Sequence, residues 1–168
     1  MIFVTLGTQK FQLNRLLIKL DELCKEGFIQ EEVYAQIGNS DYEPENFHYV
    51  RFLDRDEFEK KIKEATLIIT HSGVGSIIAA LQSEKPVIVF PRLKKYREHV
   101  DNHQLEIAEA FSKKNFVLCC LDEEKLLDTI YSVKKHTFDK YISSREKIIS
   151  IVKNAINEWK YHKKYWGI

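Results

Sequence analysis

Histidine, serine and glycine residues gather in the heptapeptide THSGVGS, residues 70–76, which directly follows the apolar run 65–69. Apolar residues at helical spacing continue over 76–81, so the heptapeptide lies where a buried strand passes into a helix. A helix that begins at Ser76 offers unpaired N–H groups and the positive end of its dipole, and both attract phosphate. The pattern therefore favours an anion site formed by these residues: His71, Ser72, Gly73, Gly75 and Ser76.

An ordinary capped turn is the alternative interpretation, because glycine and serine are also common where a strand turns into a helix. A histidine in such a turn packs or caps more often than it catalyses. His71 is nevertheless the candidate catalytic residue of this segment.

A second polar group follows the apolar run 87–90. Pro91 and Arg92 end that run, a basic loop follows, and polar residues then crowd the start of the next helix: Glu98, His99, Asp101, Asn102, His103 and Gln104. Such side chains suit sugar hydroxyls and a ribose, which need many hydrogen bonds in fixed directions. A capped surface helix with solvated charges is the alternative.

A metal site is not expected in this segment. His99 and His103 lie four residues apart on one helical face, but residue 100 is valine, so the HExxH zinc pattern is absent. We expect no metal and no cofactor.

The elements that position these groups are visible as six apolar runs rich in β-branched residues, over 2–6, 33–37, 48–52, 67–70, 87–90 and 116–119. Most are separated by stretches with helical spacing, over 11–24, 58–65, 76–81 and 100–111. Residues 38–47 are the exception and are expected to form a loop. Strands that are apolar on both faces and alternate with helices predict an α/β fold, a single parallel, doubly wound, Rossmann-like sheet.

Ligands bind beyond the carboxyl ends of the strands in such sheets. The two polar groups both follow strand ends, and so does the segment GTQK, residues 7–10, where Gly7 permits a tight turn and Thr8 opens the next helix. We therefore expect the three segments to meet at one edge of the sheet.

The chain divides by charge into two parts. A Rossmann-like domain is expected over 1–133, and its last element is a helix near 122–133. A basic helix and tail are expected over 134–168, with a long helix from about Phe138 to Tyr161. The second part carries nine basic and three acidic residues. Its last residues interleave aromatic and basic side chains, which suit a membrane interface or an acidic partner surface. Packing of this helix on its own sheet is the alternative.

Composition excludes several classes of protein. A chain of 168 residues with 44% hydrophobic content holds one core, and a net charge of +1 gives no reason to expect nucleic acid as a partner. Cys24, Cys119 and Cys120 lack metal-type spacing and are expected to be reduced thiols. Neither an apolar stretch of about 18 residues nor a secretion signal is present. A cytoplasmic location is therefore expected.

Taken together, three stretches resemble the C-terminal, donor-binding domain of the family 28 glycosyltransferases: VTLGT at 4–8, THSGVGS at 70–76 with KPVIVFPR behind it, and DNHQLEIAE at 101–109. The similarity covers about residues 1–120. Within the family the chain looks most like the small one-domain subunits of two-chain transferases. These belong to the UDP-GlcNAc transferase of N-glycan assembly and to bacterial β-1,4-galactosyltransferases of capsule and exopolysaccharide synthesis, which the stretch PRLKKYREHVDNHQ resembles in particular.

The resemblance implies the donor half of a GT-B enzyme, a nucleotide-sugar-binding domain that takes a UDP-sugar without a metal. By position, Ser72, Gly73, Gly75 and Ser76 would hold the diphosphate, and Asn102, His103 and Gln104 would contact the sugar. Phe52 and Leu53 would lie near the uracil. The other residues expected at the site are Gly7, Thr8, Arg92, Glu98 and Asp101.

Two positions depart from the two-domain relatives. The glutamate that grips the ribose there is Ala79 here, and an asparagine four residues after the motif histidine is Ile107 here. Glu98 or Glu106 is the candidate substitute for the ribose-binding glutamate.

The resemblance also implies a partner. Sugar transfer with inversion needs a base and an acceptor site, which full-length relatives carry in an N-terminal domain that this chain lacks. We expect a membrane-anchored, acceptor-binding glycosyltransferase subunit to supply both, to bring a polyprenyl-diphosphate-linked acceptor, and to hold this chain at the inner face of the membrane. The donor sugar, galactose or N-acetylglucosamine first, stays open. This chain is expected to be active only with its partner.

Two other functions are alternatives to this one. The chain could be a non-catalytic accessory subunit that enhances a partner glycosyltransferase. A UDP-sugar epimerase has a fold of similar lineage, but its two domains need a longer chain.

Overall fold

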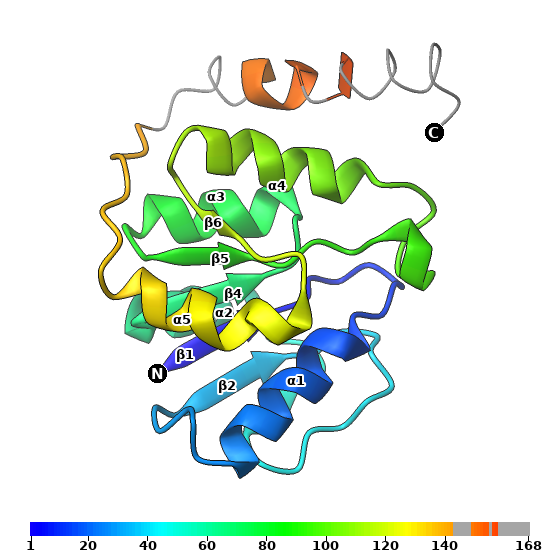
Figure 1. Ribbon diagram of the computed structural model, residues 1–168, viewed down its shortest axis with the longest axis vertical. Helices are drawn as coiled ribbons and strands as arrows, with labels where there is room; N and C mark the ends of the chain where they lie inside the picture. The colour runs from blue at the N-terminus through cyan, green and yellow to red at the C-terminus, as the bar shows by residue number, and fades with distance from the viewer. Residues whose placement is uncertain (143–148, 155, 158–168) are drawn as a thin grey trace.

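Six parallel strands form one sheet in the order β3-β2-β1-β4-β5-β6 (Figure 1). The computed structural model describes residues 1–142, 149–154 and 156–157. The strands are β1 (Ile2–Thr5), β2 (Val33–Gln36), β3 (His48–Val50), β4 (Leu67–Thr70), β5 (Val87–Val89) and β6 (Leu118–Cys119). The chain reverses direction across the sheet between β1 and β4, the switch point where doubly wound sheets bind ligands. The predicted fold class is confirmed.

Helices cover both faces of this sheet (Figure 1). They are α1 (Asn14–Lys25), α2 (Arg55–Glu64), α3 (Val74–Gln82), α4 (His103–Lys113) and α5 (Leu126–Val133), with short 3-10 turns η1 (Lys94–Tyr96) and η2 (Glu123–Lys125). Apolar side chains of α1 and α5 pack in one core cluster and those of α2, α3 and α4 in the other. The expected helix near 122–133 is therefore present as η2 and α5.

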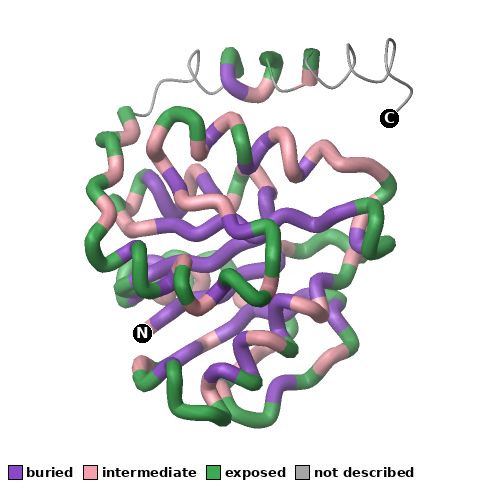
Figure 2. Tube along the Cα trace, in the orientation of Figure 1, coloured by how far each residue is buried: buried purple, intermediate pink, exposed green. Residues whose placement is uncertain are grey.

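The inner strands β1, β2, β4 and β5 are mostly buried because both of their faces are apolar, as the purple centre of Figure 2 shows. The edge strands β3 and β6 are half-buried or exposed. In β1, Ile2 and Val4 enter the cluster with α1 and α5, whereas Phe3 enters the opposite cluster. Alternation of this kind is the period of a strand, so one short run of apolar residues serves both cores.

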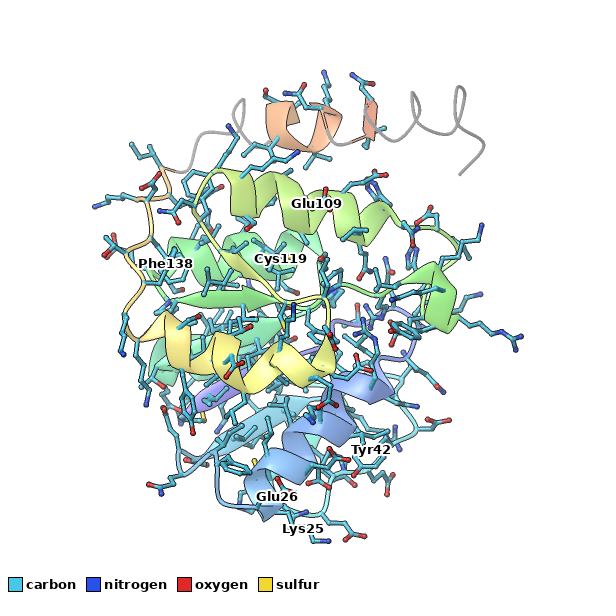
Figure 3. All side chains as sticks on the ribbon, in the orientation of Figure 1. Lys25, Glu26, Tyr42, Glu109, Cys119 and Phe138 are labelled. Carbon is cyan, nitrogen blue, oxygen red and sulfur yellow. The ribbon has the colours of Figure 1, made fainter. Side chains whose placement is uncertain are left out.

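The crossover from β2 to β3 is a loop, as expected, and hydrogen bonds to one buried carboxylate hold it in place. Asp21 on α1 is 4% exposed and accepts hydrogen bonds from the Tyr42 hydroxyl at 2.8 Å and from the amides of Glu45 and Asn46 at 3.1 and 2.7 Å. Tyr42 lies beside α1 in Figure 3. Although burial opposes ionisation, these donors lower the pKa of Asp21 below its usual value.

The four helices predicted from periodicity each begin two or three residues away from the predicted start, at Asn14, Arg55, Val74 and His103. The stretch from residue 11 becomes helical only at Asn14, since Arg92 draws the carbonyl oxygens of Phe11 and Gln12 toward its guanidinium at 2.9 and 3.1 Å. In the heptapeptide the helix begins at Val74 and not at Ser76.

The predicted start of the C-terminal helix at Phe138 is wrong. Residues 136–142 have no helical structure, because Asn115 holds them: its side chain donates to the Thr137 carbonyl at 2.9 Å, and its own carbonyl accepts from the Asp139 amide at 3.0 Å. Phe138, labelled in Figure 3, packs on the α1 and α5 side of the core. Residues 149–154 and 156–157 are helical; the rest of the predicted helix and tail lies outside the described residues.

Candidate functional site

A cleft of about 300 Å³ lies at the carboxyl ends of β1, β2 and β4. Five residues expected at the site line it: Gly7, Thr8, Leu53, Gly75 and Ser76. Thr5, Gln36, Asp54, Arg55 and Phe58 complete the lining. The structure thus brings together the turn after β1, the segment after β3 and the first turn of α3.

The first turn of α3 presents unpaired amides to this cleft. Gly73 is the N-cap, and because it has no side chain it gives the helix no capping hydrogen bond. Gly75 and Ser76, in the first turn, are cleft residues, and a Cβ added to Gly75 would meet no atom within 4 Å. The helix dipole and these N–H groups favour an anion there.

Ser72 precedes this turn and is 1% exposed. Its hydroxyl forms no hydrogen bond with any described residue. Ser72 and Gly73 do not line the cleft, so their contact with a bound anion remains a prediction.

His71 lies against two glycines of the site. A Cβ on Gly7 would stand 2.5 Å from Cε1 of its ring, and a Cβ on Gly73 would stand 2.8 Å from the same atom. Gly7 also has a φ of 71°, which disfavours any side chain. The two glycines therefore make room for an imidazole that joins the turn after β1 to the turn after β4.

Burial keeps this imidazole neutral. It lowers the pKa of His71 to about 3, and the neighbouring charge of Arg92 acts in the same direction. The Nδ1 atom lies 3.4 Å from the Thr5 carbonyl, which only accepts, so Nδ1 carries the proton. A group with so low a pKa accepts protons poorly at neutral pH, and a catalytic role for His71 remains a prediction.

Arg92 is fully buried and binds the chain itself. Its Nη2 donates to the Leu6 carbonyl at 2.8 Å as well as to that of Phe11, while Nη1 has no partner among the described residues. Burial lowers the pKa of Arg92 to about 10, so it remains a cation at neutral pH. It therefore places a fixed positive charge behind the turn of residues 6–13.

Glu98 is likewise used within the chain. Its carboxylate accepts from Nε of Arg15 at 2.9 and 3.1 Å and from the Leu93 amide at 3.0 Å. Arg15 also donates to the Pro91 carbonyl at 2.8 Å. Glu106, the other candidate for the ribose, is half-buried 3.7 Å from His103.

The polar residues before α4 form a connected set. Asp101 accepts from the His103 amide at 3.1 Å and lies 2.8 Å from Nδ1 of His99. The Asn102 side chain accepts from the Lys94 amide at 3.1 Å. Gln104 is buried and accepts from the Arg92 amide at 3.1 Å, so this group is tied to the end of β5 and lines no part of the cleft. Its contact with a donor sugar remains a prediction.

The pattern of the sequence did not identify Gln36 as a site residue. Gln36 ends β2, is 3% exposed, accepts from the Leu53 amide at 3.1 Å and donates to the Thr5 hydroxyl at 3.5 Å. It fixes the segment after β3 against the turn after β1. Its polar side chain within the apolar run 33–37 was the signal that could have identified it. Phe52, beside this segment, is 49% exposed.

The sheet also has a larger cavity, of about 690 Å³, at its opposite edge. Residues at the beginnings of strands, among them Ile2, Leu67 and Pro86, line it. Because ligands of such sheets bind beyond the carboxyl ends of the strands, this cavity is the weaker candidate for nucleotide. Within 1–142, 149–154 and 156–157, no group of His, Cys, Asp or Glu could hold a metal, and no helix could span a membrane.

Comparisons with known proteins agree with this architecture. Among solved structures, an ALG13 solution structure matches 92% of the chain and 96% of its own length, with a TM-score of 0.58 and 18% identity. The glycotransferase of kitacinnamycin matches 96% of the chain and 39% of its own, with a TM-score of 0.58 and 17% identity. MurG of Acinetobacter baumannii matches 93% and 44%, with a TM-score of 0.54 and 16% identity. These show the fold.

Curated relatives share more of the sequence. The UDP-N-acetylglucosamine transferase subunit ALG13 of Homo sapiens is 33% identical over 126 residues, 71% of this chain and 11% of the relative. The subunit of the same name from Candida albicans is 42% identical over 80 residues, 48% of this chain and 24% of the relative. The chain thus spans a quarter or less of these two proteins.

A family model covers nearly the whole chain. The glycosyltransferase family 28 C-terminal domain matches residues 1–159, which include the cleft, α3 and the polar set before α4. The chain therefore belongs to the glycosyltransferase family 28 C-terminal domain family.

Proposed function

We propose that the chain is the donor-binding and catalytic subunit of a two-chain, inverting UDP-sugar glycosyltransferase. N-acetylglucosamine is the first candidate for the transferred sugar, since the similar human and C. albicans proteins are named as UDP-N-acetylglucosamine transferase subunits. Galactose is the second, from the resemblance of residues 91–104 to bacterial subunits of polysaccharide assembly. The acceptor is a sugar on a polyprenyl diphosphate.

The observation that carries this proposal is the uncapped start of α3 in the cleft at the switch point of the sheet. The amides around Gly75 and Ser76 face the position where a diphosphate would lie. The Leu53 segment, held by Gln36, stands on the other side of the cleft for the base and ribose.

These groups act on the leaving group of the reaction. An acceptor hydroxyl attacks the anomeric carbon, the bond from that carbon to the diphosphate oxygen breaks, and UDP departs with the negative charge. Amides at the start of α3 stabilise that charge and so lower the barrier without a metal. The proton of the hydroxyl passes to a base on the partner.

The size of the cleft supports a need for that partner. A volume of about 300 Å³ stands at the lower end of the range for ligand pockets, and a nucleotide sugar with its acceptor needs more enclosure. A second, membrane-anchored subunit with a Rossmann-like fold would close the other side and contribute the acceptor site. The chain then works on the cytoplasmic face of the membrane.

Co-expression with such a subunit tests the proposal. The complex is assayed with UDP-N-acetylglucosamine, UDP-galactose, UDP-glucose and UDP-glucuronate and a lipid-linked acceptor. We expect transfer from one of these donors by the complex and none by either subunit alone. Strong transfer by this chain in isolation would contradict the two-chain arrangement.

The variant Gly75→Leu separates a donor-binding subunit from an accessory one. It puts a side chain into the open space beside Gly75. A donor-binding subunit loses transfer in the variant complex, while the complex still assembles. Ser83→Ala, at the other end of α3, is the control. Unchanged transfer by the Gly75→Leu complex would show that this chain only enhances its partner.

A further inference from the structure

Residues 93–100, named here the basic loop, project from the carboxyl edge of the sheet beyond β5 (the green 3-10 turn at the right of Figure 1). Its exposed side chains are cationic or apolar: Lys94, Lys95, Tyr96, Arg97 and Val100. Tyr96 is 45% exposed and Val100 is 68% exposed, so apolar surface accompanies the cations of this loop.

The one acidic residue of the loop points inward. Glu98 is 7% exposed and its carboxylate is engaged by Arg15 and the Leu93 amide. Separation of this kind leaves the outer surface of the loop with positive charges alone. A protein surface that only faces solvent usually carries charges of both signs, so exposure to solvent alone does not account for an outer surface with positive charges only.

The shape of the loop is fixed by contacts that do not use the exposed cations. Arg97 adopts the left-handed conformation with a φ of 60°, which is costly for a residue with a Cβ. Its amide donates to the Lys94 carbonyl at 2.9 Å, and the Lys94 amide donates to Asn102 at 3.1 Å. The cationic side chains of Lys94, Lys95 and Arg97 form no ion pair with any described residue.

Tyr96 lies among these charges. The Lys95 ammonium is 4.5 Å from the centre of its ring, and the Arg15 guanidinium is 4.7 Å from it. A ring flanked by cations, in a loop that also exposes a valine, matches the groups that bind at a membrane surface, where aromatic rings lie among headgroups and cations meet phosphates.

We propose that the basic loop contacts the surface of an anionic phospholipid membrane. The cations of the loop form no ion pair with any described residue, and its exposed side chains combine them with Tyr96 and Val100, which suits insertion between headgroups better than docking on a protein surface. The loop and the cleft share the carboxyl edge of the sheet, so this contact would turn the cleft toward the membrane. The inference does not depend on the proposed function, since it concerns lipid binding without donor or acceptor.

Vesicle co-sedimentation of the full chain tests it. Vesicles of phosphatidylcholine are compared with vesicles that also contain phosphatidylglycerol. Each cation near an anionic surface strengthens binding about fivefold at moderate salt. We expect the triple variant Lys94→Ala, Lys95→Ala, Arg97→Ala to partition at least tenfold more weakly than the parent into the anionic vesicles, and high salt to remove the difference. The double variant Tyr96→Ala, Val100→Ala should weaken binding at all salt concentrations.

The matched control removes three exposed lysines elsewhere, Lys60, Lys113 and Lys114. It loses the same charge, so it should bind like the parent if position matters. Calorimetry with UDP, run on the same variants, separates the two proposals: lipid binding lost with UDP binding kept supports the basic loop. Equal partitioning of the loop variant and the parent would overturn the inference. It would favour an acidic protein surface as the partner of these cations.

Discussion

His71 is a neutral imidazole packed between two glycine turns. The loss of water around the ring lowers its pKa to about 3. In the unfolded chain its pKa returns to about 6.5. Between these two values the unfolded state binds more protons than the folded one, so the free energy of unfolding rises with pH through this window and falls as the solution is acidified.

The pH dependence of stability tests this environment. Between pH 7 and pH 5, His71 should cost the folded protein about 2 kcal/mol of stability. Replacement by asparagine removes the titrating group, so the stability of His71→Asn should fall less over this range than that of the parent, whatever its absolute value. Urea unfolding at several pH values measures both slopes.

A substitution that removes no titrating group provides the reference. Ser83→Ala, at the end of α3, should keep the slope of the parent. Identical slopes for His71→Asn and the parent would mean that His71 titrates normally in the folded state and is not packed as described.

Gly73 and Gly75 stand two residues apart but serve different purposes. Alanine at 73 would overlap the His71 ring and should destabilise the fold by about 1–3 kcal/mol. Alanine at 75 meets open space inside a helix and should stabilise the fold by about 0.5–1 kcal/mol, yet weaken UDP binding by crowding the cleft. Thermal unfolding and calorimetry on the two variants check this. Equal effects on stability would contradict the placement of the ring.

At the scale of elements, the proposed function rests on the exposed first turn of α3. If its amides neutralise the diphosphate, UDP binding needs no divalent cation. We expect EDTA to leave the affinity of the chain or its complex for UDP within about twofold of its value in magnesium. A loss of affinity for UDP of more than tenfold, restored by Mg²⁺ or Mn²⁺, would show that a metal ion neutralises the diphosphate.

The strands were predictable because most of their residues are apolar on both faces, a pattern that depends on nearby residues alone. Helix starts were not, because they depend on residues far along the chain. The guanidinium of Arg92 delays α1 to Asn14, and Asn115 holds residues 137–139 out of a helix. Periodicity cannot report a hydrogen bond whose partner lies some twenty or eighty residues away.

At the scale of the molecule, the order of the strands brings distant turns to one cleft. Gly7, Thr8, Leu53, Gly75 and Ser76 were predictable because each follows a strand end, and parallel strands end at one edge. Gln36 escaped prediction because its role arises only when β2 lies beside β1. The predicted set before α4 is present, but it is tied by internal contacts to the end of β5.

Titration calorimetry with UDP tests the central claim that the first turn of α3 binds a nucleotide diphosphate in the cleft. The chain is measured alone and in complex with its partner, next to Gly75→Leu and the control Ser83→Ala. The account predicts saturable heat for the parent and the control, at least in the complex, and a loss of binding for Gly75→Leu. Absence of heat from the parent in both states, or equal binding by Gly75→Leu, would contradict it.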